Sequence, residues 1–311
     1  MILTVLLILL SLAILYFTAD WLVLGGASLA QRLGVSPLIV GLTIVSFGTS
    51  APELLVSIQS SLSGQGALAV GNVVGSNMFN IGIILGISAL IYPLLVKHQL
   101  FKIDVPVMII ATVAFLVTFY NGKLNFFEGF LFLVIFVSYM LYIIYKALKN
   151  KQRTKTESGF KMTRHWLVDV SLIVVGLVGL VYGSDLLVNN SIVLAREWGM
   201  SEALIGLTIV AAGTSMPELA TSVVAALKRQ SDIAIGNVIG SNIFNILLIL
   251  GTAGVITPIE TAEINLFDGA YLLVTTLILF FFMRTGRSVN RKEGLILIII
   301  YFMYFFYKLL V

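Results

Sequence analysis

The sequence predicts an all-α integral membrane protein with ten transmembrane helices in two inverted-topology five-helix repeats, with broken helices at the midplane. Three observations predict this fold class. The chain is 59% hydrophobic and only 11% charged, and its mean hydropathy of +1.05 exceeds that of soluble domains. Apolar windows of about 20 residues recur along it. The stretch from Gly41 to Gly86 returns without a gap at Gly206 to Gly251, identical at more than half of its positions.

The apolar windows define ten spans, each long enough to cross a hydrocarbon layer of roughly 30 Å. Their expected bounds are 2–31, 38–62, 66–95, 104–121, 125–149, 164–195, 203–227, 231–256, 265–284 and 290–309. The first span resembles a signal peptide, but no positive charge precedes its hydrophobic run. It also has a counterpart, since Asp20 and Asp185 are separated by the same offset as the two copies. We expect these aspartates near the ends of their spans, either in helix-end contacts or at an ion vestibule.

Five spans per copy is an odd number, so the two copies should have opposite orientations in the membrane. Such inverted repeats are typical of secondary transporters, whereas parallel halves would require an even number of spans. Sixteen Lys and Arg residues fall on the side of the hydrophilic linker and three on the other side, which predicts that both termini lie outside the cytoplasm. We expect a first repeat over 1–150, a short cytoplasmic linker over 151–163 and a second repeat over 164–311, in the cell membrane.

Each copy places one carboxylate inside an apolar span. Glu53 lies in GLTIVSFGTSAPELLVS (41–57) and Glu218 in GLTIVAAGTSMPELATS (206–222). A carboxylate at membrane depth costs at least ~2.5 kcal/mol and therefore faces a cavity, a partner or an ion. A protonated glutamate that only links helices is the alternative, and its occurrence in both copies with the same neighbours argues against it. The two glutamates are therefore the first candidates for an ion site.

A proline directly precedes each glutamate. Pro52 and Pro217 cannot donate a hydrogen bond to the carbonyl four residues earlier, so each should break its helix. The backbone carbonyls of the opened turns, including those of Ser46 and Ala211, are then expected to become available to a cation.

The next span of each copy supplies a row of polar residues at helical spacing. The rows are Asn72, Ser76 and Asn80, matched by Asn237, Ser241 and Asn245. Coordination and interhelical hydrogen bonding both remain open for these side chains, while the glycines beside them favour close helix packing. Together with the glutamates and hydroxyls, these groups offer only oxygen, which suits Ca²⁺ and Na⁺ and not soft or redox-active metals.

At these residues the chain resembles the cation/Ca²⁺ exchanger superfamily, and prokaryotic sodium/calcium exchangers in particular. The resemblance rests on a GTSxPE-like and a GNxxGSNxxN-like motif, each present twice. It implies that the ions are surrounded at the midplane by Thr49, Ser50, Glu53, Ser76, Asn80, Thr214, Ser215, Glu218, Ser241 and Asn245. It also implies that the first and sixth spans slide against the other eight to alternate access.

Three functions remain open from the sequence. The GTSAPE and GTSMPE sequences look closer to the sodium-coupled branch than to proton-coupled members, so Na⁺/Ca²⁺ exchange is preferred over Ca²⁺/H⁺ exchange and over a cation channel. Some sodium-coupled relatives and potassium-dependent ones carry an aspartate where Asn80 or Asn245 stands here, which weakens the case for K⁺ co-transport.

Other functional classes receive little support. The chain has no cysteine, and its two histidines lie in connecting segments, so neither a thiolate metal site nor an intramembrane hydrolase is expected. The net charge of +4 reflects the loop asymmetry and does not indicate nucleic-acid binding. We expect a transporter that is not an enzyme, needs no cofactor, and has Ca²⁺, Na⁺ and the lipid bilayer as its partners.

Overall fold

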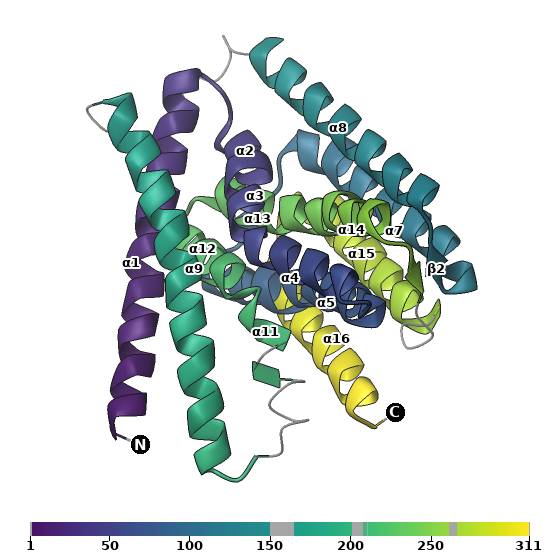
Figure 1. Ribbon diagram of the computed structural model, residues 1–311. Coiled ribbons are helices and arrows are strands. Elements are labelled where there is room, and N and C mark those ends of the chain that lie inside the picture. The colour runs from purple at the N-terminus through teal and green to yellow at the C-terminus, as the bar shows by residue number, and fades with distance from the viewer. Residues whose placement is uncertain (1, 150–164, 201–207, 210, 261–265, 311) are drawn as a thin grey trace.

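The structure is a computed structural model that describes residues 2–149, 165–200, 208–209, 211–260 and 266–310. Helices account for nearly all of these residues, together with four strands of two residues each. The predicted all-α fold is therefore confirmed (Figure 1).

In the first half of the chain, the described elements follow the five predicted spans. They are α1 (Ile2–Leu33); α2 (Pro37–Val40), the π-helical turn η1 (Gly41–Val45), α3 (Ser46–Thr49) and α4 (Ala51–Leu62); α5 (Gly66–Phe79), the π-helical turn η2 (Asn80–Ile84), α6 (Leu85–Ile91) and the strand β1 (Leu94–Leu95); the π-helical turn η3 (Leu100–Asp104), α7 (Val105–Thr118), the 3₁₀ turn η4 (Phe119–Asn121) and β2 (Lys123–Leu124); and α8 (Phe126–Lys149).

The second half repeats this order in its described part. Its elements are α9 (Trp166–Glu197); α11 (Ala211–Gly213) and α12 (Met216–Leu227); α13 (Ser231–Ile243), the π-helical turn η6 (Phe244–Leu250), α14 (Gly251–Ile256) and β3 (Ile259–Glu260); α15 (Leu266–Gly286) and β4 (Ser288–Val289); and α16 (Arg291–Leu310).

Eight helical segments among the described residues are long and apolar enough to cross a membrane. The bent pair Pro37–Thr49 and Ala51–Leu62 is a ninth candidate, and Met216–Leu227 is a shorter apolar helix within the seventh predicted span. The first part of that span, residues 203–207, lies outside the described residues. The protein is therefore a multi-pass membrane protein, with eight or nine candidate spans in its described part.

The predicted break in the second span is present. The pieces Pro37–Thr49 and Ala51–Leu62 meet at an angle of 46°, on either side of Ser50. Pro52 accounts for the break because it has no N–H to continue the hydrogen-bond ladder into the preceding turn. In the second half, α11 and α12 are separated at the equivalent place, with Pro217 in the first turn of α12.

The two long helices α1 and α9 pack side by side (Figure 1). They run antiparallel, because Arg32 at the end of α1 forms an ion pair of 2.8 Å with Asp169 at the start of α9. Glycines let the two backbones approach: a Cβ added to Gly25 would lie 2.8 Å from the Asp169 carbonyl oxygen, and one added to Gly176 would lie 2.9 Å from that of Thr18. The first helix of each half therefore contacts its counterpart closely at these glycines.

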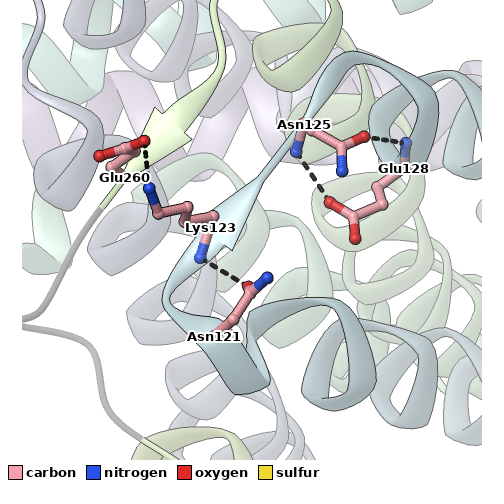
Figure 2. A network of polar contacts seen from close by, with 5 residues as sticks. All are labelled: Asn121, Lys123, Asn125, Glu128 and Glu260. Carbon is pink, nitrogen blue, oxygen red and sulfur yellow. Dashed lines mark hydrogen bonds and ion pairs between the residues drawn. The ribbon is translucent and has the colours of Figure 1, made fainter.

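Two short antiparallel ladders join the halves, with β1 paired to β4 and β2 paired to β3. Figure 2 shows the surroundings of β2, where Lys123 forms an ion pair of 2.7 Å with Glu260 of β3, and its backbone N–H donates to Asn121. A capping box begins α8: Asn125 Oδ1 accepts the Glu128 N–H, and Glu128 Oε2 accepts the Asn125 N–H. These contacts fix β2 and the start of α8.

The helices that carry the duplicated motifs are more buried than the helices at the periphery. Of the most apolar window in Ser231–Ile256, 94% of residues are buried, and the corresponding share in Gly66–Ile91 is 78%. In α8 and α16 the shares are 22% and 17%, so these helices present most of their apolar surface to the outside. The duplicated motifs therefore lie in the interior of the protein.

Candidate cation site

Glu53 and Glu218 lie in the first turns of α4 and α12, directly after the two helix breaks. They are 1% and 0% exposed. Each carboxylate accepts a hydrogen bond from the serine at the break of the other half: Ser50 Oγ donates to Glu218 Oε1 over 2.9 Å, and Ser215 Oγ donates to Glu53 Oε1 over 3.0 Å. The two breaks therefore meet inside the protein, and each half of the chain holds the glutamate of the other.

Two asparagines form hydrogen bonds to the helices that carry the glutamates. Asn72 on α5 donates from Nδ2 to the Glu53 carbonyl oxygen over 3.2 Å and to a serine hydroxyl one turn later over 3.0 Å. Asn237 on α13 repeats this arrangement with the Glu218 carbonyl oxygen (3.3 Å) and the equivalent serine (3.0 Å). Thr49 Oγ1 donates to Asn237 Oδ1 over 3.0 Å, so the asparagine of one half also binds the break of the other.

Several buried oxygen atoms have no hydrogen-bond partner among the described residues. They are Glu53 Oε2, Glu218 Oε2, Ser76 Oγ, Asn80 Oδ1 and Asn245 Oδ1. A buried polar atom without a partner carries a free-energy cost, and such atoms in native proteins call for an explanation such as a bound ion. Two carboxylates with neutral hydroxyl and amide oxygens form a ligand set that suits Ca²⁺ or Na⁺. These unpartnered oxygens are therefore candidates for ion ligands.

Two further predicted residues lie beside the carboxylates. Ser241 Oγ donates to Glu218 Oε1 over 3.4 Å, which places α13 against the second glutamate. Thr214 Oγ1 donates to Asn72 Oδ1 over 3.4 Å and is half-buried, whereas its equivalent Thr49 is completely buried. The threonine-to-asparagine bond thus occurs in both halves with different exposure, whereas Ser76, the equivalent of Ser241, has no hydrogen-bond partner among the described residues.

The carbonyl oxygens of Ser46 and Ala211 are the predicted backbone ligands. The Ser46 carbonyl is not freed, because it accepts the backbone N–H of Ser50 over 3.0 Å. This expectation is wrong because the bend falls after that turn, and α3 keeps its helical hydrogen bonding up to it. Ala211 begins α11, and the placement of its side chain lies outside what the structure describes.

The sequence reasoning left three features out of the candidate site. The first is the clamping role of Asn72 and Asn237. The second is the asparagine after each motif serine: Asn77 Oδ1 accepts from Asn245 Nδ2 over 3.1 Å, and Asn242 is fully buried with neither side-chain polar atom bonded among the described residues. Both pairs lie in the duplicated GNxxGSN sequence, so the duplication was a usable signal. The third is the π-helical winding of η2 and η6, a feature frequent at functional sites, for which periodicity gives no signal.

Comparison with known proteins shows which family the chain resembles. The family model described as "Sodium/calcium exchanger protein" matches residues 3–145 and 168–310. The putative antiporter CaxA of Alkalimonas amylolytica is 39% identical over 306 residues, with 96% of each chain covered. The sodium/calcium exchanger MaX1 of Methanosarcina acetivorans is 34% identical over 341 residues, with 95% of each chain covered. The solved structure of the sodium-calcium exchanger NCX_Mj matches with a TM-score of 0.85 at 30% identity, covering 97% of both chains.

The matched family blocks span both halves of the chain and contain both glutamates, both helix breaks and both asparagine rows. Proteins of this family are transporters of Ca²⁺ and Na⁺ that act without a cofactor, and they are not enzymes. The chain therefore belongs to the sodium/calcium exchanger family of membrane antiporters.

Proposed function

We propose that this protein is a secondary antiporter that exchanges Na⁺ for Ca²⁺ by alternating access. The observation that carries the proposal is the pair of buried glutamates. One oxygen of each is fixed by a serine of the opposite half, and the other has no partner among the described residues. Two negative charges compensate one Ca²⁺ and also attract Na⁺, so the two ions compete for one cluster of oxygens.

The proposed ion ligands are side chains from both halves, with backbone oxygens from the turns before the breaks. They are Ser46, Thr49, Ser50, Glu53, Ser76, Asn80, Ala211, Thr214, Ser215, Glu218, Ser241 and Asn245. The hydrogen bonds from Ser50 and Ser215 keep one oxygen of each carboxylate in place, which leaves the remaining oxygen for the ion. The Ser46 carbonyl oxygen accepts the Ser50 N–H over 3.0 Å and the Thr49 hydroxyl over 3.4 Å, so coordination there would replace the longer bond from Thr49.

We further propose that the halves, 1–150 and 164–311, are inverted repeats of five spans each, joined by the cytoplasmic linker 151–163, with both termini outside the cytoplasm. The antiparallel packing of α1 and α9 supports opposite orientations of the halves. The reciprocal serine-to-glutamate and threonine-to-asparagine hydrogen bonds support a pseudo-twofold relation between them.

Charge compensation couples ion binding to the change of access. Without a cation, two carboxylates lie in the membrane interior, which costs several kcal/mol for each charge. A bound cation removes this cost, so the protein alternates only when it is loaded, and the result is exchange rather than leakage. Glycines on both helices bring the α1 and α9 backbones close together, and small residues at a helix contact suit the proposed sliding movement.

The test is transport by purified protein in liposomes. Vesicles loaded with Na⁺ and placed in a Na⁺-free bath containing Ca²⁺ should accumulate Ca²⁺, and uptake should cease when the Na⁺ gradient is abolished. Uptake that follows a pH gradient and ignores Na⁺ would identify a Ca²⁺/H⁺ antiporter and refute the sodium coupling. Uptake without any counter-ion would identify a channel.

Substitution of the glutamates tests the site. Glu53→Gln and Glu218→Gln should each abolish exchange, because each removes one of the two charges that hold the ion, while both proteins stay folded in detergent. Glu260→Gln is the matched control, because Glu260 lies at the surface in the ion pair with Lys123. This variant should exchange normally. Normal exchange by both site variants would refute the assignment.

A further inference from the structure

The duplicated aspartates Asp20 and Asp185 have different surroundings, although the offset between the copies makes them equivalent. Both lie inside their helices and not at helix ends, which corrects the expectation from the sequence. Asp20 forms an ion pair with Lys228, the C-cap residue that follows α12. Asp185 is exposed and has no ion pair among the described residues. The residue equivalent to Lys228 in the first half is the neutral Ser63, so the sequence itself makes the two sides unequal.

Asp185 lines a cavity of about 310 Å³ between α9 and the two helix breaks. Its lining includes Pro52, Ser184, Asp185, Val188, Asn189 and Thr214. Ser184 is only 4% exposed, and its hydroxyl has no hydrogen-bond partner among the described residues. A buried hydroxyl without a partner, next to an unpaired carboxylate, suits a hydrated cation that passes through this cavity.

The cavity reaches both helix breaks beside the proposed cation site. Thr214 forms part of its lining, and the next residue, Ser215, donates the hydrogen bond to Glu53. Pro52, which also lines the cavity, directly precedes Glu53 in the chain. A cation at Asp185 is therefore separated from the glutamate by the residues of the two helix breaks.

The equivalent route in the other half is closed. The residues equivalent to Ser184, Val188 and Thr214 are Ala19, Val23 and Thr49, and all three are 0% exposed. Thr49 is hydrogen-bonded to Asn237 over 3.0 Å. The ion pair between Asp20 and Lys228 ties α1 to α12 beside these residues.

We propose that Asp185 attracts the transported cation into the cavity on its side of the membrane, and that the ion pair between its equivalent Asp20 and Lys228 closes the matching route on the other side. Asp185 is thus a specificity-determining residue outside the glutamate site, selective for cations by its charge. If both termini lie outside the cytoplasm, as proposed above, the route beside Asp185 faces the outside of the cell. The closed route beside Asp20 then faces the cytoplasm. The inference rests on the proposed transport function for its biological meaning, but the accessibility of the two routes can be measured without transport.

The chain contains no cysteine, so any single cysteine introduced is a unique probe. Val188→Cys and Val23→Cys form a matched pair, because they are equivalent positions with the same wild-type residue. We expect a membrane-impermeant, positively charged thiol reagent to modify Val188→Cys at least about tenfold faster than Val23→Cys. Adding Lys228→Gln should accelerate the modification of Val23→Cys several-fold, because Asp20 then no longer holds the route closed.

A second arm tests the charge. Asp185→Asn, combined with Val188→Cys, should slow the cationic reagent about threefold or more and leave a neutral reagent of similar size unaffected, since only the electrostatic attraction is removed. In liposomes, Asp185→Asn should raise the Ca²⁺ concentration for half-maximal exchange with little change in maximal rate. Equal modification of the two cysteines, or equal slowing of both reagents, would overturn the proposal. Absence of Ca²⁺ uptake by the unmodified protein would instead refute the proposed function and leave the thiol measurements interpretable.

Discussion

Replacement of Asn237 by alanine should destabilise the protein more than the same replacement of its equivalent, Asn72. Asn237 is 0% exposed and makes three side-chain hydrogen bonds, to the Glu218 carbonyl (3.3 Å), a serine hydroxyl (3.0 Å) and Thr49 (3.0 Å). At a net value of about 1 kcal/mol for each bond, the loss is about 3 kcal/mol, and the buried partners left without hydrogen bonds add to it. Asn72 is half-buried, and its bond to Thr214 is 3.4 Å long, so two good bonds and about 2 kcal/mol are lost there.

The measurement is thermal unfolding of the purified variants in detergent, without added ions. With roughly 2 °C or more for each kcal/mol in a chain of this size, Asn237→Ala should lower the midpoint by about 6 °C and Asn72→Ala by about 4 °C. Saturating Ca²⁺ should raise the midpoint of both variants, because the ion binds the folded state. A midpoint within 1 °C of the wild type for Asn237→Ala, or a larger loss for Asn72→Ala, would show that these asparagines do not fasten the site helices as the distances indicate.

Two further predictions concern packing and buried polar contacts. Tyr139→Phe should lower stability by about 1.5–3 kcal/mol, because the tyrosine hydroxyl bonds the fully buried Asp104 over 2.9 Å and the other oxygen of that carboxylate has no partner among the described residues. Tyr304→Phe is the equivalent change, and it should cost less because Lys308 still binds Asp268, the carboxylate that Tyr304 contacts. Chemical unfolding of both variants measures the two losses of stability, and equal losses would contradict this expectation. Gly236→Ala should lower stability by about 1–3 kcal/mol and impair exchange. The added Cβ would lie 2.9 Å from a backbone oxygen of α2, which no rotamer change can move. An unfolding midpoint like that of the wild type would refute this prediction.

Much of the fold follows from local sequence. The bounds of the described helices agree with the predicted spans to within a few residues, because length and apolar composition decide whether a segment crosses a membrane. The break before Glu53 follows from Pro52, whose missing N–H acts within one helical turn. The burial of both glutamates also follows, since no carboxylate is placed in lipid without a compensating group.

The partners of the site residues could not be predicted in the same way. Periodicity places Ser50 and Asn72 on polar helix faces, but it does not specify that Ser50 binds the glutamate of the other half or that Asn72 binds the carbonyl of its own. Such pairs depend on how helices far apart in the sequence cross each other. The Ser46 carbonyl shows the same limit, because the exact place of the bend decides whether it is hydrogen-bonded.

The sequence by itself determined the membrane class, the duplication, the two helix breaks and the two glutamates, because each depends on composition or on residues within one helical turn. Only the tertiary structure decided which partners the equivalent residues of the two copies have. Asp20 and Asp185 are equivalent residues that share an Asp-x-Leu-Val sequence, yet one is ion-paired with Lys228 and the other lines a cavity. The physical reason is that the contacts of a residue depend on which helices pack beside it, and a local pattern carries no information about that packing.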